Sequence, residues 1–296
     1  MINDTYNIKI VHYQDYDEVQ FFRDSVICCD DILVDEFGEI TKKKREKKKY
    51  FNPFSGEMEE VIDLDSQEFY KYVSYKRCRN TIYKLACNNK PWDYFVTFTF
   101  NGDKVDRYNF SDVSKKLSCW IDNIKRKYNC KDMGYIIVPE KHKDGAWHFH
   151  GFFKNCDNLN FIDSGIKDKQ GRTIYNISNY KFGFTTATKL SDIDKAVSYI
   201  LKYISKDLFG DSLKGKKRYW RSKNLEMPAV STAIFEGNKI DLMKMLGHDI
   251  DYITSSQSVW NEGTYIQLKK HIEDTENFNA DRFIQIIGGV EIEEDN

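Results

Sequence analysis

The chain lacks several features that would have defined its class at once. No run of residues approaches the ~18 apolar side chains that a membrane-spanning helix needs, and Met1–Asp4 lacks the basic-then-apolar pattern of a signal peptide. The seven cysteines include no C-x-x-C, so the sequence predicts neither a disulfide framework nor a four-cysteine zinc site. No G-x-x-x-x-G-K-[ST] occurs, which excludes a helicase of the P-loop type. We therefore expect a cytoplasmic protein with reduced thiols and no membrane partner.

Charge is distributed unevenly along the chain. The 296 residues carry a formal net charge of −1, but residues 69–224 hold 31 Lys and Arg against 15 Asp and Glu, whereas the two flanks together hold 14 against 31. A basic middle between acidic flanks is typical of a nucleic-acid-binding domain, although a lysine-rich surface can also serve solubility alone. Hydrophobic residues (41%, with 15% aromatic) suffice for a core and exclude wholesale disorder.

Hydrophobic patterns in the basic segment predict an α+β fold with a central antiparallel sheet flanked by helices. Period-two runs of β-branched and aromatic residues indicate strands, and apolar residues at helical spacing indicate helices. In chain order, the predicted elements are a helix over 67–89, a strand over 94–100, a helix over 111–128, a hairpin of strands 134–139 and 147–153, a strand near 180–186 and a helix over 191–208.

The flanks are less informative. Residues 42–49 (KKKREKKK) form a charge run that fits a solvated loop or hairpin tip, although it could also touch phosphates. The chain turns acidic after Pro228, where helices are indistinct. We therefore divide the chain into an N-terminal extension, 1–66, a central domain, 67–225, and an acidic C-terminal extension, 226–296.

A His-x-His motif lies on the predicted strand 147–153. Because alternate side chains of a strand face the same side, His148 and His150 can reach one metal ion. The motif alone is weak evidence, since half-exposed histidines are common on strands. Two further candidate ligands, Glu140 and His142, lie just upstream. A carboxylate beside two imidazoles suits Mn²⁺ or Mg²⁺ better than a structural zinc site.

The register of the hairpin decides whether Glu140 can join the histidines. A two-residue loop, Asp144–Gly145, would pair residue 141 with His148 and turn Glu140 away. A three-residue loop over 143–145, or a five-residue loop with the same centre, would pair Glu140 with His148. We expect one of the two longer loops.

The helix predicted over residues 191–208 separates two kinds of side chain. Its apolar stripe comprises Ile193, Ala196, Val197, Ile200, Leu201, Ile204 and Leu208. Nearly opposite this stripe lie Tyr199, Lys202, Tyr203 and Lys206. Tyrosines that serve a core would join the stripe. The arrangement fits a solvated amphipathic helix, or phenolic nucleophiles whose oxyanions are favoured by adjacent lysines.

Three segments resemble, in the same order, motifs I, II and III of HUH-type rolling-circle replication initiators. They are Phe95–Phe100 (FVTFTF), Trp147–Phe153 (WHFHGFF) and Tyr199–Lys206 (YILKYISK). The stretches 138–147 and 218–223 also resemble segments that precede motif II and follow motif III in plasmid and phage members. The resemblance covers roughly residues 76–228 and implies the HUH nuclease fold with extra segments at both ends.

The resemblance implies a metal-dependent endonuclease that nicks and rejoins single-stranded DNA through a 5′-phosphotyrosine. His148 and His150 become metal ligands, with Glu140 as the third, for a divalent Mn²⁺ or Mg²⁺ cofactor. Thr97 and Thr99 take supporting places on the strand beside the site.

The doubled Tyr-x-x-Lys pattern looks like the two-tyrosine branch of the family. Tyr199 and Tyr203 would each attack in turn, with Tyr199 slightly favoured for the first attack, and Lys202 or Lys206 would neutralise developing negative charge. Single-tyrosine members also carry a second, non-catalytic tyrosine nearby, so which of the two attacks stays open.

The implied partners are single-stranded DNA at a replication origin, a host helicase and a DNA polymerase in a bacterial cytoplasm. Four aromatic residues are candidates for stacking on bases: Trp120, Trp147, Tyr219 and Trp220. The alternatives are a transposase or relaxase of the same superfamily, or a DNA-binding regulator that keeps the fold without cutting.

Overall fold

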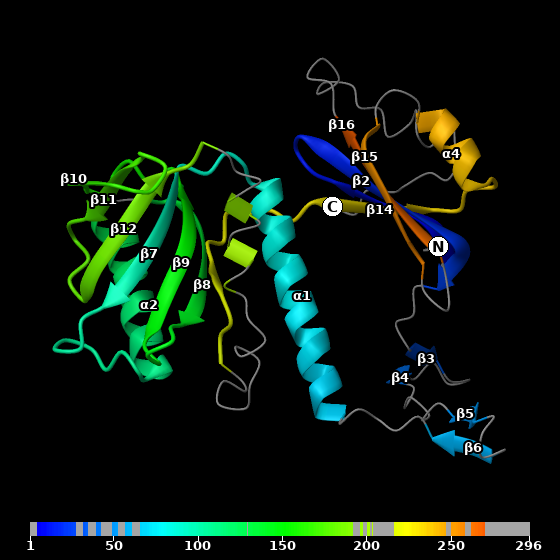
Figure 1. The fold of residues 1–296 in the computed structure, drawn as a ribbon, viewed down its shortest axis with the longest axis horizontal. Helices are drawn as coiled ribbons and strands as arrows, with labels where there is room; N and C mark the ends of the chain where they lie inside the picture. The colour runs from blue at the N-terminus through cyan, green and yellow to red at the C-terminus, as the bar shows by residue number, and fades with distance from the viewer. Residues whose placement is uncertain are drawn as a thin grey trace. The chain divides into compact units, whose positions relative to one another are not determined.

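The computed structural model divides the chain into two compact units (Figure 1). It describes residues 5–27, 32–34, 40–42, 49–52, 57–60, 66–128, 130–191, 196–197, 200–201, 203, 216–246, 250–257 and 262–269. The flanking unit comprises Met1–Ile62 and Pro228–Asn296, and the central unit comprises Asp63–Met227. Among the described residues, no helix combines the length and apolar character that crossing a membrane requires.

The central unit is an α+β fold built on a seven-stranded antiparallel sheet. Its elements are α1 (Ser66–Asn88), β7 (Tyr94–Phe100), α2 (Phe110–Lys127), β8 (Gly134–Lys141), β9 (Trp147–Lys154), β10 (Phe161–Lys167), β11 (Thr173–Ile177), β12 (Gly183–Lys189) and β13 (Trp220–Arg221). The strand order is β10-β11-β12-β7-β9-β8-β13. Both helices and the strands β7, β8, β9 and β12 are confirmed, whereas β10 and β11 were not predicted.

Alternation along β7 sorts its side chains onto two faces of this sheet. Val96, Phe98 and Phe100 are buried and face α2, since the Phe98 ring meets that of Trp120 at a centroid distance of 5.2 Å. Figure 1 shows α2 lying against this face. A buried phenylalanine side chain contributes roughly 2–3 kcal/mol by leaving water. The α2 face therefore supplies much of the stability that holds the opposite face in place.

The opposite face of the sheet carries the polar residues of the predicted site. Thr97 pairs with His150, Thr99 pairs with His148, and His148 pairs with Glu140. Directly opposed residues of antiparallel strands point to the same side, so these five side chains share one face. We call it the histidine face.

The helix predicted over 191–208 is described in part. Ala196, Val197, Ile200, Leu201 and Tyr203 are helical, and the four aliphatic residues of this set are buried. The prediction is confirmed for these residues. The remaining stripe positions, Ile193, Ile204 and Leu208, lie outside the described residues.

The flanking unit joins both ends of the chain in one five-stranded sheet. Its elements are β1 (Thr5–His12), β2 (Tyr16–Ile27), β14 (Ala229–Ala233), α4 (Lys239–Leu246), β15 (Ile250–Gln257) and β16 (Glu262–Lys269), with strand order β14-β1-β2-β16-β15. Two small hairpins pair β3 (Ile32–Val34) with β4 (Ile40–Lys42) and β5 (Lys49–Asn52) with β6 (Glu57–Glu60). A shared core of aliphatic and aromatic residues joins α4 to this sheet. The sequence analysis treated the two flanks as separate extensions, because pairing between such distant segments leaves no local pattern.

Candidate active site

The β8–β9 hairpin adopts the register that brings Glu140 opposite His148. The backbone N–H of His142 donates to the carbonyl of Ala146 (2.8 Å), and that of Gly145 donates to the carbonyl of His142 (2.9 Å). Gly145 has a φ of 88°, a left-handed conformation that glycine adopts without steric cost. The prediction of a longer loop is confirmed, and glycine at this position is the local reason for it.

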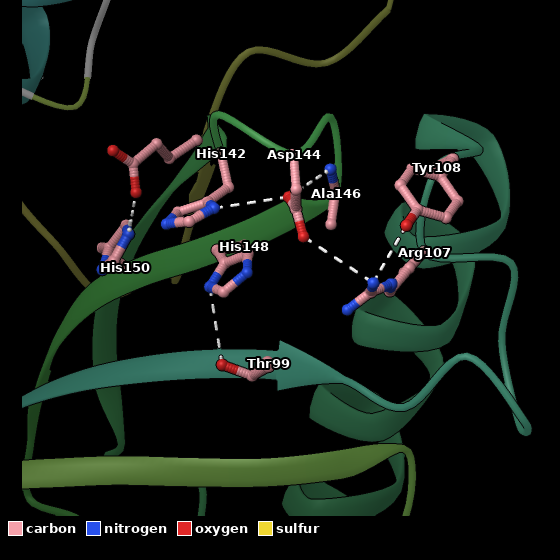
Figure 2. Close-up of polar contacts among 9 residues, drawn as sticks. Thr99, Arg107, Tyr108, His142, Asp144, Ala146, His148 and His150 are labelled. Carbon is pink, nitrogen blue, oxygen red and sulfur yellow. Dashed lines mark hydrogen bonds and ion pairs between the residues drawn. The ribbon is translucent and has the colours of Figure 1, made fainter.

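Hydroxyl groups of β7 contact the inner nitrogens of both histidines. Thr97 Oγ1 shares a hydrogen bond with His150 Nδ1 at 3.0 Å, and Thr99 Oγ1 lies 3.5 Å from His148 Nδ1. Figure 2 shows His148 turned toward Thr99. With each Nδ1 engaged in this way, the Nε2 atom is the nitrogen left to bind a ligand. His150 Nε2 lies 2.7 Å from Glu140 Oε2.

Burial and charge set the protonation of the carboxylate and of His148. Burial acts to raise the pKa of Glu140, but the hydrogen bond with His150 and the nearby histidine charges outweigh it and lower that pKa. The pKa of His148 is lowered, first by burial and then by the charges of His142 and His150. At neutral pH, Glu140 is therefore ionised and His148 is neutral, which are the forms that bind a cation.

A polar cluster at the hairpin tip adjoins the histidine face (Figure 2). The His142 ring stacks on that of His148 at a centroid distance of 5.1 Å, and its Nδ1 lies 3.3 Å from Asp144 Oδ1. Arg107 Nη2 lies 3.7 Å from Asp144 Oδ2. The sequence analysis missed Arg107, because no motif linked the loop before α2 to the hairpin. The cluster fixes the tip beside His148 and keeps His142 available as an alternative ligand.

The donor atoms of the histidine face fit one edge of the coordination shell of a divalent ion. Within the described part of the chain, no three His, Cys, Asp or Glu side chains converge closely enough to hold a metal as they stand. The 2.7 Å between His150 Nε2 and Glu140 Oε2 is nevertheless close to the about 3 Å between adjacent ligand atoms of an octahedral ion bound at ~2.1 Å. His148 occupies the position opposite Glu140. A carboxylate with imidazoles is a donor set that suits Mn²⁺ or Mg²⁺.

Tyr203 lies directly against the metal-ligand candidate His150. The two rings stack at a centroid distance of 3.8 Å and an interplanar angle of 11°, and Phe95 stacks on Tyr203 at 6.4 Å. The phenol oxygen is one bond beyond its ring, so a phosphate held at His150 lies within its reach. The three other predicted catalytic residues lie outside the described residues: Tyr199, Lys202 and Lys206.

The prediction that tryptophans stack on DNA bases is wrong. Trp120, Trp147 and Trp220 are only 4%, 5% and 3% exposed, because their rings fill the α2 side of the sheet. The large exposed aromatic residues of the central unit are instead Phe184 (60%) and Tyr108 (55%). Phe184 pairs with Thr99, which places it on the histidine face in the same row as His148.

Comparison with known families relates this fold and site to replication proteins. Residues 93–208 match the family model of the replication-associated protein ORF2. The matched segment runs from just before β7 through the hairpin to the Tyr199–Lys206 sequence. No curated protein and no solved structure gives a significant match. The family match supports the coarser part of the sequence interpretation, a protein that acts in replication initiation.

Proposed function

We propose that the central unit is an HUH-type endonuclease of a rolling-circle replication initiator, which nicks and rejoins single-stranded origin DNA. The observation that carries this proposal is the stacking of Tyr203 on His150 at 3.8 Å. The tyrosine and the histidine come from separate segments of the chain, and the fold brings the proposed nucleophile to the proposed metal ligand. A tyrosine that only solvated its helix would not need this neighbour.

His148, His150 and Glu140 are the proposed ligands of a divalent Mn²⁺ or Mg²⁺ ion. When bound, the ion would polarise the oxygens of the scissile phosphate as a Lewis acid. Thr97 and Thr99 hold the inner ring nitrogens and so orient the outer nitrogens toward the ligand position.

The proposed reaction exchanges one phosphate ester for another. The tyrosine oxygen attacks the scissile phosphorus, and the new O–P bond forms as the bond from phosphorus to the 3′-oxygen breaks. The phenol gives up its proton and the released 3′-oxygen gains one, which leaves a 5′-phosphotyrosine and a free 3′-OH. A later 3′-OH can reverse the attack, so rejoining needs no ATP. Covalent catalysis of this kind divides one difficult step into two, and Lys202 or Lys206 would neutralise the negative charge that develops.

The basic charge of the central unit suits a single-stranded DNA substrate. Phosphate attraction by lysine and arginine supplies affinity that does not depend on sequence. Because no P-loop motif is present, strand separation and synthesis would fall to a host helicase and polymerase in a bacterial cytoplasm. This would place the chain in the initiation step alone.

Phe184 is the proposed stacking platform for a base beside the cleavage site. Its ring is exposed and it shares a row of the histidine face with Thr99 and His148. We expect Phe184→Ala to weaken single-stranded DNA binding by about 10-fold, since one base–aromatic stack contributes about 1–3 kcal/mol. Fluorescence anisotropy with a labelled oligonucleotide measures this loss.

The control for Phe184 is Tyr252→Ala, which removes a comparably exposed aromatic ring (54%) from the flanking unit. Phe184→Trp should retain the affinity, because it keeps a stacking surface. Equal affinities of the Phe184→Ala variant and the wild-type protein would remove this residue from the binding site.

Nicking of single-stranded DNA tests the proposed function itself. Single-stranded fragments that tile the parent replicon are incubated with the full chain, with Mn²⁺ or with a chelator, and resolved on a denaturing gel. We expect one fragment to be cut in Mn²⁺, with its 5′ end attached to the protein. Binding without cleavage of any fragment would favour a non-cleaving regulator. Cleavage confined to element ends or to a transfer origin would favour a transposase or relaxase.

Glu140→Gln should weaken metal affinity by about 10–100-fold, if loss of a ligand costs at least as much as loss of its outer support. The substitution keeps the side-chain shape but removes the charge and one strong ligand atom. Mn²⁺ titration by calorimetry measures the effect, with Asp122→Asn on the exposed side of α2 as the matched control. An unchanged titration would assign the third position to His142 or to water.

A further inference from the structure

A basic pocket lies at the β13 edge of the central unit. It has a volume of about 370 Å³ and is lined by Ser74, Cys78, Lys217, Arg218, Tyr219 and Arg221. The lining thus combines three cationic side chains with two hydroxyls and a thiol, and none of these described residues carries a carboxylate. Guanidinium, ammonium and hydroxyl donors around one cavity are the groups that bind phosphate.

The charges of this pocket are incompletely compensated. Burial lowers the pKa of Lys217, and Asp122 offsets this only in part. Burial also lowers the pKa of Arg218, where Cys78 opposes the effect. Burial raises the pKa of Cys78 to about 11, so its thiol is uncharged at neutral pH. A bound anion would supply the compensation that the lining residues do not.

The pocket opens on the same side of the sheet as the candidate active site. Arg221 pairs with Ile136, and Ile136 pairs with Phe152, two residues beyond His150 on β9. Directly opposed residues share a face, so Arg221 lies on the histidine face. Two strand spacings and two residue rises place its backbone about 12 Å from that of His150. A single strand can span this distance within a few nucleotides.

We propose that the pocket binds one backbone phosphate of the DNA strand that is cleaved at the histidine face. The proposal rests on the proposed function and adds an anchor to it, with Lys217 and Arg221 as the main contacts. A contact of this kind fixes the register of a strand without reading its sequence. The strand would then cross the histidine face between Phe184 on β12 and the pocket beside β13.

The test couples a protein variant to a change in the DNA. Binding of a labelled single-stranded oligonucleotide is measured by anisotropy with the full chain in chelator, so that no nicking is required. The double variant Lys217→Gln, Arg221→Gln should bind about 10-fold more weakly than wild type, as expected for loss of charge-assisted hydrogen bonds. The slope of log affinity against log salt should fall by about 0.7, the value for one phosphate of a single strand. The control, Lys115→Gln with Lys131→Gln, removes the same charge from two exposed lysines outside the pocket.

Neutral methylphosphonate linkages, placed one position at a time, locate the bound phosphate. We expect one position at which the neutral linkage weakens binding by wild type but not by the pocket variant. Equal losses in both proteins at every position, or an equal effect of the control variant, would overturn the proposal. Inorganic phosphate bound by the pocket without any coupling to DNA would also overturn it, in favour of a free anion. A wild-type protein that binds DNA but never nicks it would contradict the proposed function and leave this result readable.

Discussion

The double variant Tyr199→Phe, Tyr203→Phe should form no covalent adduct with DNA, a loss of at least about 1,000-fold in line with removal of other catalytic nucleophiles. Phenylalanine keeps the ring, and so keeps the stacking on His150 seen for Tyr203. It removes only the attacking oxygen. The adduct is measured by transfer of labelled DNA to protein on a denaturing gel. Tyr108→Phe is the control, since it removes an exposed hydroxyl that accepts a hydrogen bond from Arg107.

The two single variants should differ from each other. We expect Tyr199→Phe to lose most of the initial cleavage and Tyr203→Phe to impair strand transfer, because two nucleophiles are needed only when the first is already occupied. Peptide mapping of the labelled adduct assigns the attacking residue. Label on any residue other than these two tyrosines would overturn the mechanism.

Alanine at His148 or His150 should abolish nicking while leaving DNA affinity within about threefold of wild type, since lysine and arginine contacts to phosphate supply most of that affinity. His150 is buried (5% exposed) and links Thr97 to Glu140 through its two nitrogens. Its loss removes both a proposed ligand and the link between β7 and β8. Nicking is measured in Mn²⁺ and binding is measured in chelator.

Two further variants separate chemistry from folding. His150→Gln retains a polar side chain in the buried position, and thermal unfolding shows whether the fold is intact. His142→Ala should reduce nicking only mildly, because its ring stacks on His148 without being one of the proposed ligands. Wild-type nicking by the double variant His148→Ala, His150→Ala would end the metal hypothesis.

The sequence by itself determined the elements whose signals are local. The unbroken aromatic and β-branched run of β7 and the helical spacing of the apolar residues in α2 both predicted the structure. Gly145 fixed the hairpin turn, and the turn fixed the register that places Glu140 opposite His148. Each of these features depends on contacts between residues that are near in sequence, so a pattern in the chain suffices to predict it.

Only the tertiary structure decided which distant residues meet. It joined the two flanks in one sheet through the pairing of β1 with β14, and it buried the tryptophans that the sequence analysis had offered to DNA. It also stacked Tyr203 on His150 and gathered Cys78 and Arg221 around one pocket. The physical reason is common to all four cases. Burial and strand pairing depend on the whole set of packed neighbours, and those neighbours are separated by up to more than two hundred residues of chain.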